Sequence, residues 1–175
     1  FKNNFDGGTN GVGMTTGNTG GASGDAFTAV EPDAVFSNAR AQSGALSMQP
    51  PSAAGSGLAR WAAGTPNVAT RLYARCDVAH TGDYILWQAR GATSASSSGQ
   101  ASVLIDGANK LRVREQVGGT NLWTAAAAFP LNEWVRIEIL IETGTTATSG
   151  RLRVAYYLGD NLTPIDDTGW LENLD

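Results

Sequence analysis

Strict alternation of apolar and polar residues marks three segments of this chain as β-strands. In each of them every second residue is apolar or small, which is the two-residue period of a strand with one face in a core. The segment 68–78 places Thr70, Leu72, Ala74, Cys76 and Val78 inward. The segment 134–142 places Val135, Ile137, Ile139 and Ile141 inward, and 151–158 places Leu152, Val154, Tyr156 and Leu158 inward. Burial of each large aliphatic side chain stabilises the fold by about 1.5–3 kcal/mol before entropy is counted.

Shorter apolar runs between turn residues predict further strands at 25–30, 45–49, 58–63, 84–90, 101–105 and 111–117. Asp106-Gly107 separates the last two and predicts a tight hairpin turn in which the glycine has a positive φ. No window longer than ten residues has a helical period, and Pro130 limits the alanine run at 125–128 to a single turn. The pattern therefore predicts an all-β fold, a two-sheet antiparallel sandwich.

The length of 175 residues supports one domain. Its first 24 residues are rich in Gly, Asn and Thr, a composition that favours extended and turning backbone. We therefore expect a single β-sandwich domain over 1–175 with a Gly-rich N-terminal arm over about 1–24, either flexible or packed on a sheet edge. The chain begins at Phe1 and shows no signal-peptide pattern, so we expect a processed form or a part of a longer protein.

Charge and composition remove several classes of function. The net charge of −4 argues against a nucleic-acid partner, since such proteins are normally basic. No apolar run approaches the length of a transmembrane helix, so we expect no membrane partner. The regular apolar strands argue against a disordered chain. Cys76 is the one cysteine, so no intrachain disulfide forms, and its place in an alternating strand predicts a small buried hydrophobe.

Few residues of the sequence are candidates for catalysis or metal binding. Asp77, His80 and Asp83 are three residues apart, but this set lacks the ligands that zinc or calcium requires, so no metal site is predicted. Glu138 and Glu142 share a strand face, but four residues of strand span about 13 Å, too far for a glycosidase pair. Adjacent carboxylates at 166 and 167 would point apart on an extended chain and predict a solvated loop. We expect no catalytic residues and no enzyme activity.

The polar faces of the three long strands are more informative. They carry Arg71, Tyr73 and Arg75; then Trp134, Arg136 and Glu138; then Arg151, Arg153 and Tyr157. If these strands are neighbours, guanidinium groups alternate with aromatic rings, which can pack on sugar faces while arginines bind carboxylate, sulfate or hydroxyl groups. The predicted ligand-binding residues are Arg71, Tyr73, Arg75, Trp134, Arg136, Arg153 and Tyr157. Two alternatives stay open: a solvated face with cross-strand Arg–Glu pairs, and a contact with another subunit.

Five segments together resemble a known family: GGASGDAFTAV (20–30), ARAQSGALSMQ (39–49), RLYARCDV (71–78), NEWVRIEILIE (132–142) and RLRVAYYLGDNLTPI (151–165). The chain resembles the concanavalin A-like (laminin G-like) jelly-roll modules of actinobacterial secreted proteins and phage virion proteins. The resemblance implies a two-sheet antiparallel jelly roll with sugar binding on the concave face or at a loop edge, and calcium in some members. No calcium ligand set matches here, so no cofactor is expected.

The same resemblance guides the expected activity. Its glucanase branch carries Glu-x-Asp-x-Glu on a central strand, and Leu140 stands here in the place of the aspartate, which argues against hydrolysis. Such modules usually end in a strand that returns beside the N-terminal one. Because the chain stops at TGWLENLD (168–175), we expect that closing strand to be missing or to come from a neighbouring molecule.

Two functions follow from the resemblance and the polar face. The first is a non-enzymatic structural or adhesion module of a phage virion: a capsid decoration, tail fibre or minor tail protein. Its partners would be further copies of itself in a homo-oligomer, or other virion subunits. The second is a carbohydrate-binding, lectin-like module of a secreted or glycan-active protein, with cell-surface polysaccharide as its partner. The expected location is the virion, or the extracellular space for the second function.

Overall fold

The computed structural model describes residues 1–31, 33–50, 59–65, 67–90, 99–115, 119–144 and 149–174, with the backbone alone at 99 and 100. Within these ranges the chain forms antiparallel β-sheets, and the one helical segment is the 3-10 turn η1, Gly21–Ser23. The all-β class is therefore confirmed. The contacts divide the chain into two compact units, Phe1–Gly64 and Thr65–Asp175, called unit 1 and unit 2 below.

Unit 1 consists of short strand pairs around a small aromatic core. β1 (Ala29–Val30) pairs with β4 (Ala59–Arg60), and β2 (Val35–Ser37) pairs with β3 (Ser47–Gln49). The buried apolar side chains of this core are Met14, Phe27, Ala34, Phe36 and Leu46. Three of these strands are shorter than the predicted segments 25–30, 45–49 and 58–63, and β2 was not predicted.

The Gly-rich segment 1–24 takes part in unit 1. The Met14 amide donates to the Ala34 carbonyl (2.8 Å), and Gly13 forms a β-bridge with Val35. A Cβ atom at Gly8 would lie 2.2 Å from the Phe36 ring, so this glycine permits the close approach of backbone to a buried aromatic. The segment thus contributes both backbone hydrogen bonds and core contacts.

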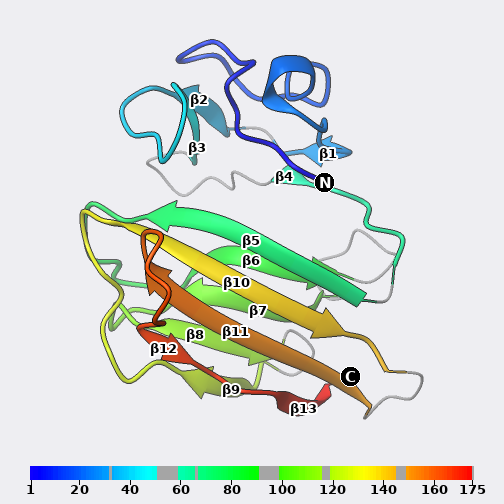
Figure 1. Cartoon of the computed structure of the whole chain (residues 1–175), viewed down its shortest axis with the longest axis vertical. Helices are drawn as coiled ribbons and strands as arrows, with labels where there is room; N and C mark the ends of the chain where they lie inside the picture. Colours follow the sequence, from blue (N-terminus) through cyan, green and yellow to red (C-terminus); the bar gives the residue numbers. More distant parts are fainter. Residues whose placement is uncertain are drawn as a thin grey trace. The chain divides into compact units, whose positions relative to one another are not determined.

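The first sheet of unit 2 contains the three long alternating strands. β5 (Asn67–Arg75), β10 (Trp134–Glu142) and β11 (Gly150–Leu158) are nine residues each. The order is β12-β11-β10-β5, with β12 (Asp166–Asp167) and β13 (Leu171–Leu174) both paired to β11 (Figure 1). β10 therefore lies between β5 and β11, and every pairing is antiparallel.

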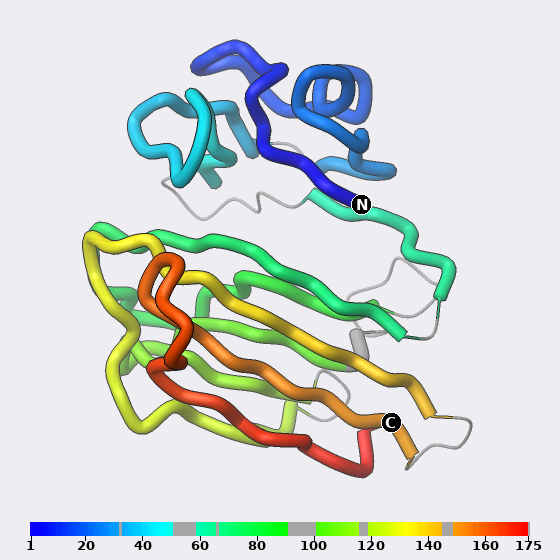
Figure 2. Tube along the Cα trace, viewed as in Figure 1, coloured from blue at the N-terminus to red at the C-terminus, as the bar shows by residue number. Residues whose placement is uncertain are grey.

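The second sheet of unit 2 is a four-stranded meander. β6 (Tyr84–Arg90), β7 (Gly99–Ile105), β8 (Leu111–Glu115) and β9 (Asn121–Thr124) pair in chain order, each antiparallel to the next (Figure 2). One core joins the two sheets. It includes Val103, Ile105, Leu111 and Val113 from this sheet and Val135, Ile137, Ile139, Leu152, Val154 and Tyr156 from the other. The antiparallel sandwich is thus confirmed, and the jelly-roll connectivity stays a prediction.

Most of the predicted inward positions on the three long strands are confirmed, and two of these predictions are wrong. Val135, Ile137, Ile139 and Ile141 are buried, as are Cys76, Leu152, Val154 and Tyr156. Val78 is 70% exposed, because β5 ends at Arg75 and the chain at Val78 forms a bend instead of a strand. Leu158 is 38% exposed, because it is the last residue of β11. Alternation predicts facing only as far as the strand continues.

The C-terminal segment forms β13, which pairs with β11. The expectation that a strand beside the N-terminal one is missing or borrowed stays a prediction. One other expectation differs from the structure. The β7–β8 connection runs from Asp106 to Lys110, and its residue with positive φ is Asn109 (57°) rather than Gly107. The Asn109 amide donates to the Asp106 carbonyl (2.9 Å), so the connection is a three-residue hairpin loop with the left-handed residue last.

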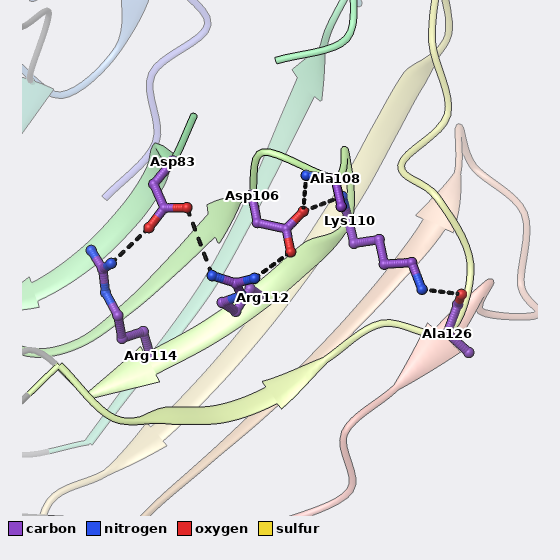
Figure 3. A network of polar contacts seen from close by, with 7 residues as sticks. All are labelled: Asp83, Asp106, Ala108, Lys110, Arg112, Arg114 and Ala126. Atoms are coloured by element: carbon purple, nitrogen blue, oxygen red, sulfur yellow. Dashed lines mark hydrogen bonds and ion pairs between the residues drawn. The ribbon is translucent and has the colours of Figure 1, made fainter. Parts of the chain in front are cut away.

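The Asp106 side chain explains this choice of turn (Figure 3). Its Oδ1 accepts hydrogen bonds from the amides of Ala108 and Lys110, both at 2.9 Å, and its Oδ2 accepts one from Arg112 Nη2 at 2.5 Å. The Lys110 ammonium donates in turn to the Ala126 carbonyl (2.9 Å). One buried carboxylate thus fixes the turn and connects it to β8.

Candidate functional site

The outer face of the five-stranded sheet brings the predicted polar residues together, because β5, β10 and β11 are neighbours. The register places their outward side chains in rows across the three strands. Tyr73, Arg136 and Tyr157 form one row; Arg71, Glu138 and Ala155 form the next; Ala69, Leu140 and Arg153 form the third. The spatial condition on which the ligand-binding prediction depended is therefore met, while the binding itself stays a prediction.

A groove of about 430 Å³ lies on this face. It is lined by Ala69, Thr70, Arg71, Glu138, Leu140, Arg153, Ala155 and Tyr157. The hollow has a simple cause: the short side chains of Ala69 and Ala155 stand beside the longer ones of Leu140 and Glu138 on β10. Its volume falls within the roughly 300–1,000 Å³ typical of small-molecule sites. We call this feature the outer-face groove.

Ion pairs hold the charged walls of the outer-face groove. Arg71 donates to Glu138 Oε1 through Nε (2.9 Å) and Nη2 (2.8 Å), and Arg136 Nε lies 3.3 Å from the same oxygen. Arg153 donates two parallel hydrogen bonds to Asp167, from Nε to Oδ1 (3.0 Å) and from Nη2 to Oδ2 (2.5 Å). The Arg153 guanidinium holds the pKa of the Asp167 carboxyl below its ordinary value. The cross-strand Arg–Glu pairing that the sequence allowed is therefore present.

A polar cluster closes one end of the same face. The Tyr73 hydroxyl donates to Asp160 Oδ1 (2.6 Å), and this hydrogen bond is the main reason that the pKa of Tyr73 is raised. Arg136 is 8% exposed, donates to the Asn161 carbonyl (2.8 Å) and lies 4.2 Å over the Tyr157 ring. These contacts attach the loop after β11 to the sheet and fix the position of Tyr157.

Two of the predicted ligand residues lie away from the groove. Arg75 and Trp134 stand opposite each other at the end of the sheet, and Arg75 pairs with Asp77 (2.7 Å). Tyr73 and Arg136 share a row with Tyr157 but do not themselves line the groove. The predicted residues that line it are Arg71, Arg153 and Tyr157. Arg151, on the same face, pairs with Glu142 (2.7 Å) and lies 4.3 Å over the Trp170 ring.

Glu138, Leu140 and the two alanines line the groove but were not among the predicted ligand-binding residues. Ala69 and Ala155 are small residues at outward positions of polar strand faces, and this irregularity is the signal that could have located the hollow. Leu140 is 40% exposed on the same face, which gives the floor of the groove an apolar element.

The candidate catalytic and metal residues have other partners. Glu138 is bound by Arg71, and Glu142 by Arg151. Asp83 accepts a hydrogen bond from Arg114 (2.7 Å) and lies 3.7 Å from Arg112 (Figure 3), while the His80 ring stacks on Tyr84. Among the described residues, no group of three or more His, Cys, Asp or Glu side chains could hold a metal ion.

Comparisons with protein-family models, curated proteins and solved structures each give no match. The resemblance to concanavalin A-like modules therefore stays a prediction. Over the part of the chain that the structure describes, no helix is long and apolar enough to span a bilayer.

Proposed function

We propose that this chain is a non-enzymatic adhesion module that binds a saccharide in the outer-face groove. The observation that carries the proposal is the groove itself, a hollow that combines an aromatic ring, an apolar floor and ion-paired polar walls. Sugars present apolar ring faces and polar hydroxyls at once, so a site for them needs both kinds of surface. Tyr157, Leu140 and Ala155 supply the first kind, and Arg71 and Glu138 supply the second.

Rigidity supports a binding role. The Tyr157 ring is fixed by the guanidinium of Arg136, and the Arg71 and Arg153 side chains are held by carboxylates. Side chains that are already ordered lose less conformational entropy when a ligand binds, which raises affinity at a given contact area. The groove is thus organised before any ligand arrives.

The arrangement of Glu138 and Glu142 favours saccharide binding without hydrolysis. A glycosidase needs two carboxyl groups on either side of the scissile bond. Glu138 is bound by arginine, and the next carboxylate along the strand face, Glu142, is bound by Arg151, with Leu140 between them. We propose the phage virion as the setting, with self-assembly or other virion subunits as partners, on the resemblance alone.

The test compares two aromatic residues of the same sheet face. The full chain is applied to a glycan array and to isolated bacterial cell-wall polysaccharide, and Tyr157→Ala and Trp134→Ala are measured beside it. Tyr157 lines the groove and Trp134 does not, so we expect Tyr157→Ala to weaken binding at least tenfold and Trp134→Ala to retain it. A tenfold loss corresponds to about 1.4 kcal/mol.

A second variant blocks the groove without removing any contact group. Ala69 is exposed and lines the hollow, so Ala69→Trp fills the space while the circular dichroism spectrum stays that of the wild type. We expect this variant to lose binding. No binding by the folded wild type, or full binding by Ala69→Trp, would overturn the proposal.

A further inference from the structure

We propose that the outer-face groove selects uncharged saccharides and rejects anionic ones, because carboxylates already neutralise the guanidinium groups that line and flank it. This inference rests on the proposed function and specifies its ligand class. Arginines on a sheet face would by themselves suggest a site for sulfated or acidic sugars. The pairing of these arginines points to the opposite selectivity.

The charges around the groove balance one another. Three guanidiniums, those of Arg71, Arg136 and Arg153, face three carboxylates, those of Glu138, Asp160 and Asp167. Glu138 Oε1 lies within 3.3 Å of both Arg71 and Arg136, Arg136 Nη1 lies 3.8 Å from Asp160, and Arg153 binds Asp167 through both of its carboxylate oxygens. The groove therefore has no net positive charge that would attract an anion.

An anionic sugar would lie beside a fixed carboxylate. A sulfate or carboxylate only accepts hydrogen bonds, so it can bind the guanidinium N–H groups but not the acceptor oxygens of Glu138 or Asp167. Those carboxylates are anchored to the sheet, so each stays close to the incoming anion, and like charges at that distance repel. Binding of an acidic sugar thus gains no net attraction from the paired arginines and meets a repulsion from their partners.

A hydroxyl group meets no such obstacle. It donates one hydrogen bond and accepts others, so it can bridge a guanidinium N–H and a carboxylate oxygen without breaking the pair between them. The Arg71–Glu138 pair presents a donor and an acceptor side by side at the groove, and the Arg71 side chain is 63% exposed. Adjacent hydroxyls of a neutral sugar match that arrangement.

The experiment uses polysaccharides that share a backbone and differ in charge. Binding of the full chain is measured against dextran, mannan and galactan, and against the sulfated and carboxymethylated form of each. We expect the neutral form to bind at least tenfold more tightly than its charged derivatives at 0.15 M salt. We also expect dextran sulfate to compete poorly against the neutral ligand.

Two variants should reverse the selectivity. Glu138→Gln releases Arg71 and Arg136, and Asp167→Asn releases Arg153, so each is expected to raise affinity for the sulfated form at least tenfold, with a gain that falls as salt is added. Glu142→Gln is the matched control. It makes the same change in net charge and releases Arg151 on the same face, but it does not line the groove, so we expect less than a twofold gain.

The outcomes separate this inference from the function on which it rests. Equal wild-type binding of a neutral polysaccharide and its sulfated form, each lost in Ala69→Trp, would overturn the selectivity and keep the saccharide-binding function. An equal gain in Glu142→Gln and Glu138→Gln would also overturn it, because the effect would then be one of net charge. No wild-type binding to any of these polysaccharides, to the glycan array or to the cell-wall polysaccharide would overturn both proposals.

Discussion

At the scale of single residues, the core of unit 2 contains a polar atom whose removal should not weaken the fold. Tyr156 is fully buried, and its hydroxyl has no hydrogen-bond partner among the described residues. Burial, with a smaller effect from Asp166, raises the pKa of Tyr156 to about 12. A buried hydroxyl without a partner costs about 1–3 kcal/mol of desolvation, so Tyr156→Phe should keep or increase the free energy of unfolding.

Urea unfolding of Tyr156→Phe measures this effect directly. The control is Tyr157→Phe, which removes the same atom from the half-buried neighbour on the outer face and should change stability by less than 0.5 kcal/mol or so. A loss of more than about 1 kcal/mol in Tyr156→Phe would contradict the prediction, since it would mean that the hydroxyl is satisfied in the folded state.

The inward residues show what alternation can and cannot predict. Ile137 and Val154 lie in the middle of nine-residue strands, where the two-residue period is unbroken, and both are fully buried. Val78 and Leu158 belong to the same patterns but lie past the end of β5 and at the end of β11. Strand ends depend on tertiary hydrogen bonds that the local pattern does not contain.

At the scale of elements, β12 is a strand of this sheet that the sequence pattern did not predict. Adjacent carboxylates at 166 and 167 predicted a solvated loop, whereas Asp167 is half-buried and bound by Arg153 of β11. Its partner is 14 residues away, and the contact exists only once β12 has paired with β11. The turn at Asp106 is similar. The Asp-Gly pair predicted its position, but its type depends on the Asp106 carboxylate, which accepts hydrogen bonds from the amides of Ala108 and Lys110.

The Arg153–Asp167 pair makes the free energy of unfolding depend on pH in the acid range. Because the pKa of Asp167 in the folded state is lowered from its ordinary value of 3.8, the carboxylate stabilises the fold fully above that value. This contribution is lost as pH falls through the lowered folded-state pKa. We therefore expect Asp167→Asn to reduce the free energy of unfolding at pH 7 and to reduce it progressively less as the pH approaches 2.

Urea unfolding from pH 7 to pH 2 checks this expectation as the difference between variant and wild type at each pH. Arg153→Gln and the double variant complete a mutant cycle, in which the coupling between the two residues should shrink in acid. A difference that stays constant across the range would show that protonation of Asp167 does not affect stability.

At the scale of the whole molecule, the two units differ in how far the sequence predicted them. Unit 2 has long alternating strands, so its sandwich and the shared face of β5, β10 and β11 followed from the pattern. Unit 1 has strands of two or three residues, and its core depends on close contacts such as that of Gly8 with Phe36. Such contacts join residues far apart in the chain and leave no periodic signal.

The same difference predicts that residues 65–175 fold by themselves. Among the described strands, both sheets of unit 2 pair only within that range, and the large core runs from Cys76 to Leu174. A fragment 65–175 should therefore show a β-sheet circular dichroism spectrum and one cooperative unfolding transition, and it should keep the saccharide binding of the full chain. Ile137→Ala in the fragment removes a fully buried side chain and should lower the free energy of unfolding by about 2–5 kcal/mol. A fragment with no cooperative transition would show that the sandwich needs residues 1–64, and the division into two units would then describe contacts without independent stability.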